Sequence, residues 1–253
     1  MRHIPTNYCA LLMLASLMFL ETSVPRAVSS QDAIRRTTSP AELAVLVARS
    51  GYTGEFVLAM PEQLQSAFAA SPDRSVLDYR SAFGFWMNRE MTGPGASRPP
   101  VSIAAIDTEL KTYAAARGAA ITTPSSSTHR TVKDPAATFC LARLKSMVSM
   151  PVQGTDLVSV LATAVGRATG GIDSRGSVGS CVGTNQFAPQ SVYIDGGESL
   201  ENVLNRGVER FGSAVWVAIQ GGPDICSVGV VHRAEGGGAC YATLTPNLAS
   251  AAR

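Results

Sequence analysis

The chain has 253 residues, a hydrophobic fraction of 45%, and a formal net charge of +2 at pH 7 from 21 basic and 19 acidic side chains. Because the basic residues are scattered along the chain, the composition favours neither a nucleic-acid-binding nor an anionic-lipid-binding surface. The apolar content suffices for a core in one large domain or two small ones.

Residues 1–30 have the features of a secretory signal peptide. Arg2 precedes the apolar run Cys9–Leu20, which is too short to cross a bilayer, and small residues follow that run. We therefore expect cleavage near Ser29 or Ser30. The mature protein is expected to be exported to the periplasm or the cell exterior, without a transmembrane segment.

Residues 31–121 are expected to form a mainly helical N-terminal region. Ser39 and Pro40 have the residue types of the N-cap and the first position of a helix that ends before Gly51. The spacing of apolar residues also predicts a strand at 55–59 and helices at 62–69, 76–91 and 103–117.

The segment 122–135 is polar, rich in Ser and Thr and bracketed by prolines, which is typical of a linker. His129 lies within this segment and is expected to be exposed to solvent. Beyond it, residues 136–253 are expected to form a separate domain in which helices alternate with strands. Strands are predicted at 148–153, 191–195, 214–220, 225–232 and 239–245, the last two joined by a glycine-rich hairpin loop.

Four of the five cysteines lie in the expected mature chain, at Cys140, Cys181, Cys226 and Cys240. An even number of cysteines in an exported chain predicts two disulfides. Their spacing contains no C-x-x-C pair, so we expect no metal site. Three pairings are open. The favoured one joins Cys226 to Cys240 across the hairpin and leaves Cys140 with Cys181.

Two helical segments of the C-terminal domain repeat one another. The segment "GTDLVSVLATAVGRAT" begins at Gly154 and "GESLENVLNRGVERFG" begins at Gly197, with identical residues at six of the sixteen positions. In each, apolar residues recur at i, i+3, i+4, i+7 and i+8, so each predicts a helix with one apolar face. A β-α-β unit used twice would place both helices on one face of a small sheet.

The stretches "MPVQGTDLVSVLATAVGRATG" and "QSVYIDGGESLENVLNRGVERFGSAVWVAI" resemble the short N-terminal (STN) domain of secretins and TonB-dependent transducers. In that family a strand, a G-x-x-L-x-x-V-L helix and a second strand occur twice, and the resemblance covers about residues 148–233. It implies a non-enzymatic periplasmic domain that docks onto another protein. The spacer 170–190 is long and Gly-rich and contains Cys181, so the family's usual partner does not carry over.

The sequence lacks the common signatures of metalloproteases, nucleotide-binding proteins and serine hydrolases. One fragment suggests catalysis, because Cys181 lies in a G-x-C-x-G sequence and is followed by Asp195 or Asp224 and then by His232. This is the order of nucleophile, acid and base in an α/β-hydrolase. Against that interpretation, the residues around Cys181 predict neither the strand nor the helix that such a nucleophile requires, and Cys181 is expected to be a half-cystine.

The sequence therefore predicts an α+β fold with a helical N-terminal region and a βαββαβ-like C-terminal sheet extended by a hairpin. The predicted function is that of an exported, non-enzymatic module that binds another envelope or extracellular protein and requires no cofactor. Binding would use the sheet face and the sheet edges that the helices leave open. The alternative is a secreted hydrolase that acts through Cys181 and His232.

Overall fold

A computed structural model describes residues 40–70, 82–91, 99–122, 128–154, 157–168, 175–182, 191–233 and 239–245. The expected signal peptide, residues 1–30, and its cleavage site near Ser29 or Ser30 lie outside the described residues. All the described residues belong to one unit of the chain, Thr37–Arg253.

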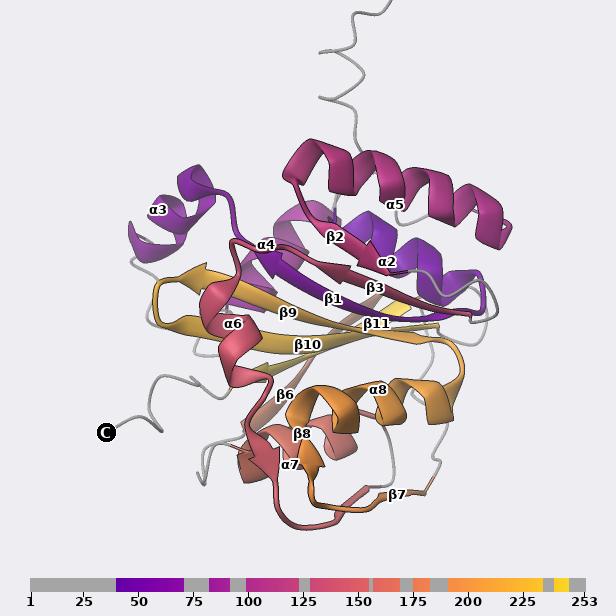
Figure 1. The fold of residues 1–253 in the computed structure, drawn as a ribbon, viewed down its shortest axis with the longest axis vertical. Coiled ribbons are helices and arrows are strands. Elements are labelled where there is room, and N and C mark those ends of the chain that lie inside the picture. Colours follow the sequence, from indigo (N-terminus) through magenta and orange to yellow (C-terminus); the bar gives the residue numbers. More distant parts are fainter. Residues whose placement is uncertain are drawn as a thin grey trace, which may run out of the picture. The chain divides into compact units, whose positions relative to one another are not determined.

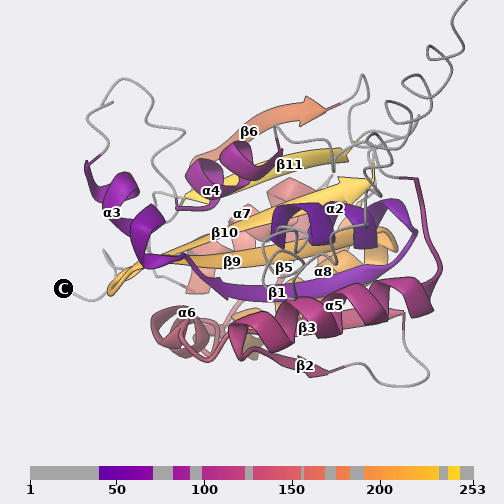
Figure 2. The same ribbon diagram turned by 90° about the horizontal axis from the view of Figure 1, so that it is seen from above.

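The main sheet of this unit has seven strands in the order β2-β3-β1-β9-β10-β11-β6 (Figure 2). Strand β1, the third in this order, is parallel to both of its neighbours, β3 and β9, and the other neighbouring strands are antiparallel. The strands are β1 (Thr53–Ala59), β2 (Ala120–Thr122), β3 (His129–Lys133), β6 (Arg175–Val182), β9 (Ala214–Gly222), β10 (Ile225–Arg233) and β11 (Ala239–Thr245).

Helices cover both faces of this sheet (Figure 1). One face carries α2 (Pro40–Arg49), α4 (Ala82–Met91) and α5 (Ile103–Arg117), and the other carries α6 (Thr138–Arg143), α7 (Leu157–Ala168) and α8 (Leu200–Phe211). Strand β9 is buried throughout, since Val215 and Val217 pack toward the first group of helices whereas Trp216 and Ala218 pack toward the second. The α+β class is thus confirmed, as two helical layers around a mixed sheet.

The helices near the N-terminus match the sequence prediction. Helix α2 runs from Pro40 to Arg49, and α3 (Glu62–Ala70) and α5 lie at the predicted positions. Ser102 caps α5 by accepting a 3.3 Å hydrogen bond from the amide of Ala105, which satisfies one of the free N–H groups of the first turn.

The predicted division into a region 31–121, a linker 122–135 and a domain 136–253 is wrong. One sheet draws β1 from the first segment, β3 from the second and β9 from the third, and these strands lie side by side. A strand that is buried on both faces, as β1 is, needs partners on both edges. The charged residues of β3 suggest a loop, but they find partners inside the fold, as Arg130 does with Asp107 of α5.

The repeat is confirmed as two matching helices. Both bounds of α7 and α8 differ by 43 residues (200 − 157 and 211 − 168), and the apolar faces of both helices lie in one core on one side of the sheet. The two repeated glycines have different roles. A Cβ on Gly154 would lie 2.8 Å from Cγ2 of Val160, whereas Gly197 has a φ of +88°, which favours glycine.

The strands that precede these helices do not join the main sheet. Strand β4 (Met147–Val148) pairs with β8 (Glu198–Ser199), and β5 (Val152–Gly154) pairs with β7 (Val192–Ile194), both antiparallel. We call these two pairs the ribbons. Figure 1 shows β7 on the far side of α8 from the main sheet. The prediction that these strands and helices form one βαββαβ sheet is therefore wrong, but both helices do pack on the same face of the main sheet.

Two further expectations need correction. The sheet face that should have been open is covered by α2, α4 and α5. The spacer 170–190, expected to lack regular structure, contains β6, which lies at one end of the main sheet and carries Cys181. Its Gly and Ser residues have low strand propensity, so its conformation depends on pairing with β11. The hairpin of β10 and β11 is confirmed.

Candidate functional site

A cluster of polar side chains lies between α8 and the sheet. Glu55 of β1 is only 2% exposed, and its Oε1 lies 2.9 Å from Nζ of Lys133 in β3. Lys133 also donates a 2.7 Å hydrogen bond to Oε1 of Glu201. Asn205 donates to Oε2 of Glu55 at 2.7 Å and accepts at 2.6 Å from Nε1 of Trp216. Each charged group of this cluster has a partner on a neighbouring element, as burial requires.

The surroundings shift the pKa values of two groups in this cluster. Burial raises the pKa of Glu55, and the hydrogen bonds from Lys133 and Asn205 oppose that rise without cancelling it. For Lys133, burial acts to lower the pKa, but its interactions with Glu201 and Glu55 outweigh burial and raise it. Lys133 therefore stays charged as the counter-ion of two carboxylates.

The cluster continues to the beginning of β1 and β3. Nδ1 of His129 and Oγ1 of Thr53 form a 2.9 Å hydrogen bond. Nδ1 of His129 also lies 4.0 Å from Oε1 of Glu209. The prediction that His129 is solvent-exposed is wrong, since its side chain is only 13% exposed. Burial lowers its pKa. Glu201, Asn205 and Glu209 follow at i, i+4 and i+8 along α8, so the cluster fixes that helix onto the sheet.

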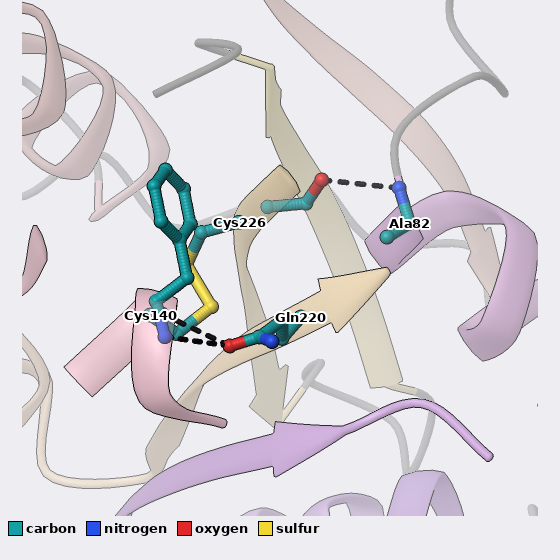
Figure 3. Close-up of a disulfide and its surroundings, with 6 residues drawn as sticks. Ala82, Cys140, Gln220 and Cys226 are labelled. Carbon is teal, nitrogen blue, oxygen red and sulfur yellow. Dashed lines mark hydrogen bonds between the residues drawn. A yellow bond between two sulfur atoms is a disulfide. The ribbon is translucent and has the colours of Figure 1, made fainter. Parts of the chain in front are cut away.

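A disulfide joins Cys140 of α6 to Cys226 of β10 (Figure 3). Beside it, Oε1 of Gln220 accepts from the amides of Phe139 at 2.8 Å and Cys140 at 3.3 Å. The predicted pairs Cys226–Cys240 and Cys140–Cys181 are wrong. In the hairpin, His232 is the residue opposite Cys240, whereas Cys226 lies near the beginning of β10 and within reach of α6.

The residues of the alternative catalytic site are only partly brought together. His232 and Cys181 lie in one row across β10, β11 and β6, with Cys240 between them. Asp224 lies at the opposite end of β10, about 27 Å along the strand from His232. Asp195 precedes α8, whereas the ring of His232 contacts Phe211 at the last turn of that helix, with a centroid distance of 6.2 Å.

These positions do not form a nucleophile–base–acid triad. Two strand spacings separate the Cα atoms of Cys181 and His232 by about 10 Å, and neither Asp195 nor Asp224 lies beside His232. Burial lowers the pKa of His232, and its ring makes a T-shaped contact with Phe211. In a triad of the expected kind, the acid lies beside the general base.

The ribbons carry a feature that the sequence did not reveal. Three large hydrophobic side chains are exposed on the ribbons and on the link between β4 and β5. They are Met147 (57%) of β4, Met150 (58%) of the link and Tyr193 (55%) of β7. Val192 and Ile194 on either side of Tyr193 are buried, so the ribbons turn one face to the core and Tyr193 away from it. The alternation Val-Tyr-Ile was a usable signal, but a three-residue strand is too short for periodicity to identify it.

The ribbons are held in place by main-chain hydrogen bonds as well as by packing. The amide of Gly197 donates to the carbonyl of Val148 at 2.7 Å, and that of Leu200 donates to the carbonyl of Ser146 at 2.8 Å. Tyr193 of β7 lies opposite Gln153 of β5. The three exposed side chains thus project from a preformed surface, which we call the ribbon surface.

Within the described ranges, no group of three or more His, Cys, Asp or Glu side chains is placed to hold a metal ion. Nor is any helix there long and apolar enough to cross a bilayer. Comparisons with family models, with curated proteins and with solved structures give no match for the chain.

Proposed function

We propose that this chain is an exported, non-enzymatic module that binds another envelope or extracellular protein through the ribbon surface. The observation that carries the proposal is the exposure of Met147, Met150 and Tyr193, each more than half exposed, on the two ribbons and the link between β4 and β5. Both ribbons pack on the same helices. Large apolar side chains exposed on a preformed surface can form an interaction site.

The chemistry of the ribbon surface favours a protein partner with an apolar contact face. Methionine side chains are flexible and polarizable and can adapt to a partner's shape, while tyrosine supplies a rigid contact at low entropic cost. The exposed charges near the ribbons have both signs, since Lys145 and Asp195 are exposed and Glu198 pairs with Arg206. An anionic bilayer would favour a basic cluster instead.

Two further observations support the proposal. The disulfide between Cys140 and Cys226 is typical of proteins in an oxidising compartment, which agrees with export. The resemblance of residues 148–233 to the STN domain implies docking onto another protein. In this chain the docking element would be the ribbons, because helices cover both faces of the main sheet.

Site-directed photo-crosslinking of the full-length chain in its producing cell tests the proposal. A benzophenone amino acid replaces Tyr193 in one variant and Lys111, an exposed residue of α5 on the opposite helical layer, in the control. We expect a discrete adduct with one other protein from position 193 and none from position 111. Adding Met147→Ser and Met150→Ser should reduce the yield at 193 at least tenfold, because these changes remove the apolar contact.

Other outcomes contradict the proposal. An adduct of the chain with a second copy of itself would make the ribbon surface a dimer interface, and an adduct with lipid alone would make it a membrane contact. Equal yields at positions 193 and 111, or a yield that does not depend on Met147 and Met150, would show that the surface has no specific partner. Circular dichroism and retention of the Cys140–Cys226 disulfide confirm that each variant is folded.

A further inference from the structure

The backbone register of the main sheet brings two other cysteines together. Cys240 of β11 is the direct partner of Cys181 of β6 in the antiparallel ladder. Residues that face each other in such a ladder lie on the same side of the sheet, with Cα atoms about 4.5 or 5.5 Å apart. Both distances lie within the range that a disulfide spans.

The remaining cysteines of the fold do not compete for this pair. Cys140 and Cys226 are already joined to each other. The only other cysteine in the sequence is Cys9, which belongs to the expected signal peptide. An exported chain that carries one disulfide has met an oxidising environment. Two further cysteines in direct register would meet the same oxidising conditions.

We propose that Cys181 and Cys240 form a second disulfide that fastens the terminal strand β6 to β11. The reaction consumes the disulfide of a thiol–disulfide oxidant. One cysteine thiolate attacks that disulfide and releases one oxidant thiol, and the second cysteine then displaces the other oxidant thiol from the mixed disulfide. The two cysteine thiols lose two protons and two electrons, and the oxidant's disulfide becomes two thiols.

The position of β6 explains what this bond does. Among the described strands, β6 lies at one edge of the main sheet and pairs with β11 alone. Its sequence, Arg-Gly-Ser-Val-Gly-Ser-Cys-Val, has low strand propensity. A bond between opposite residues fixes the register of such a strand, and the register shifts immediately beyond Cys240. The bond also occupies the sulfur of Cys181, which removes the nucleophile of the alternative hydrolase. This inference does not rest on the proposed binding function.

Tryptic mapping distinguishes the pairings, because the four cysteines fall in four different tryptic peptides. These are residues 134–143 for Cys140, 176–206 for Cys181, 211–233 for Cys226 and 234–253 for Cys240. The full-length chain is produced with export, denatured without reductant, alkylated with iodoacetamide and digested. We expect a linked pair of 176–206 with 234–253, and a second linked pair of 134–143 with 211–233, with no alkylation of the four cysteines.

Two single substitutions provide matched variants. Cys181→Ser should leave Cys240 as the alkylated residue, while 134–143 stays linked to 211–233. Cys140→Ser should leave Cys226 alkylated, while 176–206 stays linked to 234–253. In limited proteolysis, Cys181→Ser should increase the rate of cleavage within residues 170–190 more than Cys140→Ser does.

The proposal is overturned if Cys181 and Cys240 are both alkylated in exported protein whose Cys140–Cys226 bond is intact. It is also overturned if Cys181→Ser frees Cys140 or Cys226 in place of Cys240. If the Cys181–Cys240 link is lost only in variants that fail to fold, the conclusion does not change, because the peptide map of the wild-type protein alone decides the pairing.

Discussion

Asn205 of α8 donates a 2.7 Å hydrogen bond to Oε2 of Glu55, a residue that is only 2% exposed in the interior strand β1. The same amide side chain accepts the indole N–H of Trp216. Helix α8 is thus joined to β1 and to β9 through one side chain. Because these strands come from distant parts of the chain, Asn205 contributes to the packing of the whole unit.

We predict that Asn205→Leu lowers the free energy of unfolding by about 2–4 kcal/mol, because it leaves a buried carboxylate oxygen and a buried indole N–H without partners. Urea unfolding at pH 7 measures the loss. Glu209→Ala is the control, since Glu209 lies on the same helix but is more than half exposed, and its effect should be under about 0.5 kcal/mol. Equal effects of the two changes would contradict the structural role of Asn205.

A second prediction concerns pH. Burial raises the pKa of Glu55 in the folded protein above its ordinary value of 4.5. At pH values between 4.5 and this raised pKa, the folded protein binds the Glu55 proton more tightly than the unfolded chain does. The contribution of Glu55 to stability is therefore largest below pH 4.5 and is lost as the pH rises through its folded pKa. Glu55→Gln removes this dependence.

The measurement for this prediction is the difference in unfolding free energy between wild type and Glu55→Gln at several pH values. That difference should shift in favour of Glu55→Gln as the pH rises from 4.5. His129 and His232 contribute in the opposite direction. Burial lowers their pKa values below 6.5, so they destabilise the fold as the pH falls below 6.5. Wild type and Glu55→Gln both keep these histidines, and their contribution therefore cancels in the difference. A difference that does not vary with pH would contradict the prediction.

A third prediction uses two glycines that differ in the room beside them. A Cβ on Gly229 of β10 would overlap the ring of Phe83 from α4, whereas a Cβ on Gly207 of α8 would lie 3.3 Å from the Cδ2 atom of Leu161. We expect Gly229→Ala to lower stability by about 1–3 kcal/mol. Gly207→Ala should stay within about 1 kcal/mol of wild type, because the helix propensity of alanine offsets the tight contact.

Urea midpoints of the two variants test this contrast. The double variant Gly229→Ala with Phe83→Ala should cost less than the sum of the two single changes, since removal of the ring makes room for the new methyl group. Additive costs would mean that Gly229→Ala acts through something other than the ring of Phe83.

The elements that the sequence predicted well are those with a strong local signal. Helices α5, α7 and α8 follow from the spacing of their apolar residues. Strand β6 was missed because its Gly and Ser residues become a strand only through pairing with β11. Strand β3 was missed because it combines charged residues with Val132, and their partners come from α5 and α8.

The candidate sites were harder to predict for a related reason. The pairing of Cys140 with Cys226 depends on how α6 packs against β10, which no local pattern encodes. Glu55 is an isolated acid in an apolar strand, and only the fold shows that Lys133 and Asn205 neutralise and hydrogen-bond it. Met147, Met150 and Tyr193 are ordinary apolar residues in the sequence, and their exposure is a property of the ribbons alone.

The last prediction follows from the shared sheet. A fragment of residues 146–253 contains both repeated helices but lacks β1, β3 and the helices that cover Val215, Val217 and Ile219, all of which are fully buried in β9. Exposing each of these side chains costs about 1.5–3 kcal/mol, and β9 also loses its parallel partner β1. We therefore expect the fragment not to fold alone.

Far-UV circular dichroism with urea tests this expectation against the unit Thr37–Arg253. To make the two chains comparable, the fragment carries Cys226→Ser, and the longer chain carries both Cys140→Ser and Cys226→Ser, so that neither has the disulfide. The longer chain should unfold in one cooperative transition, while the fragment should show none. A cooperative transition of the fragment at a similar urea concentration would mean that the repeat is an independent domain, because its helices and ribbons would then suffice to stabilise β9 without the N-terminal half of the sheet.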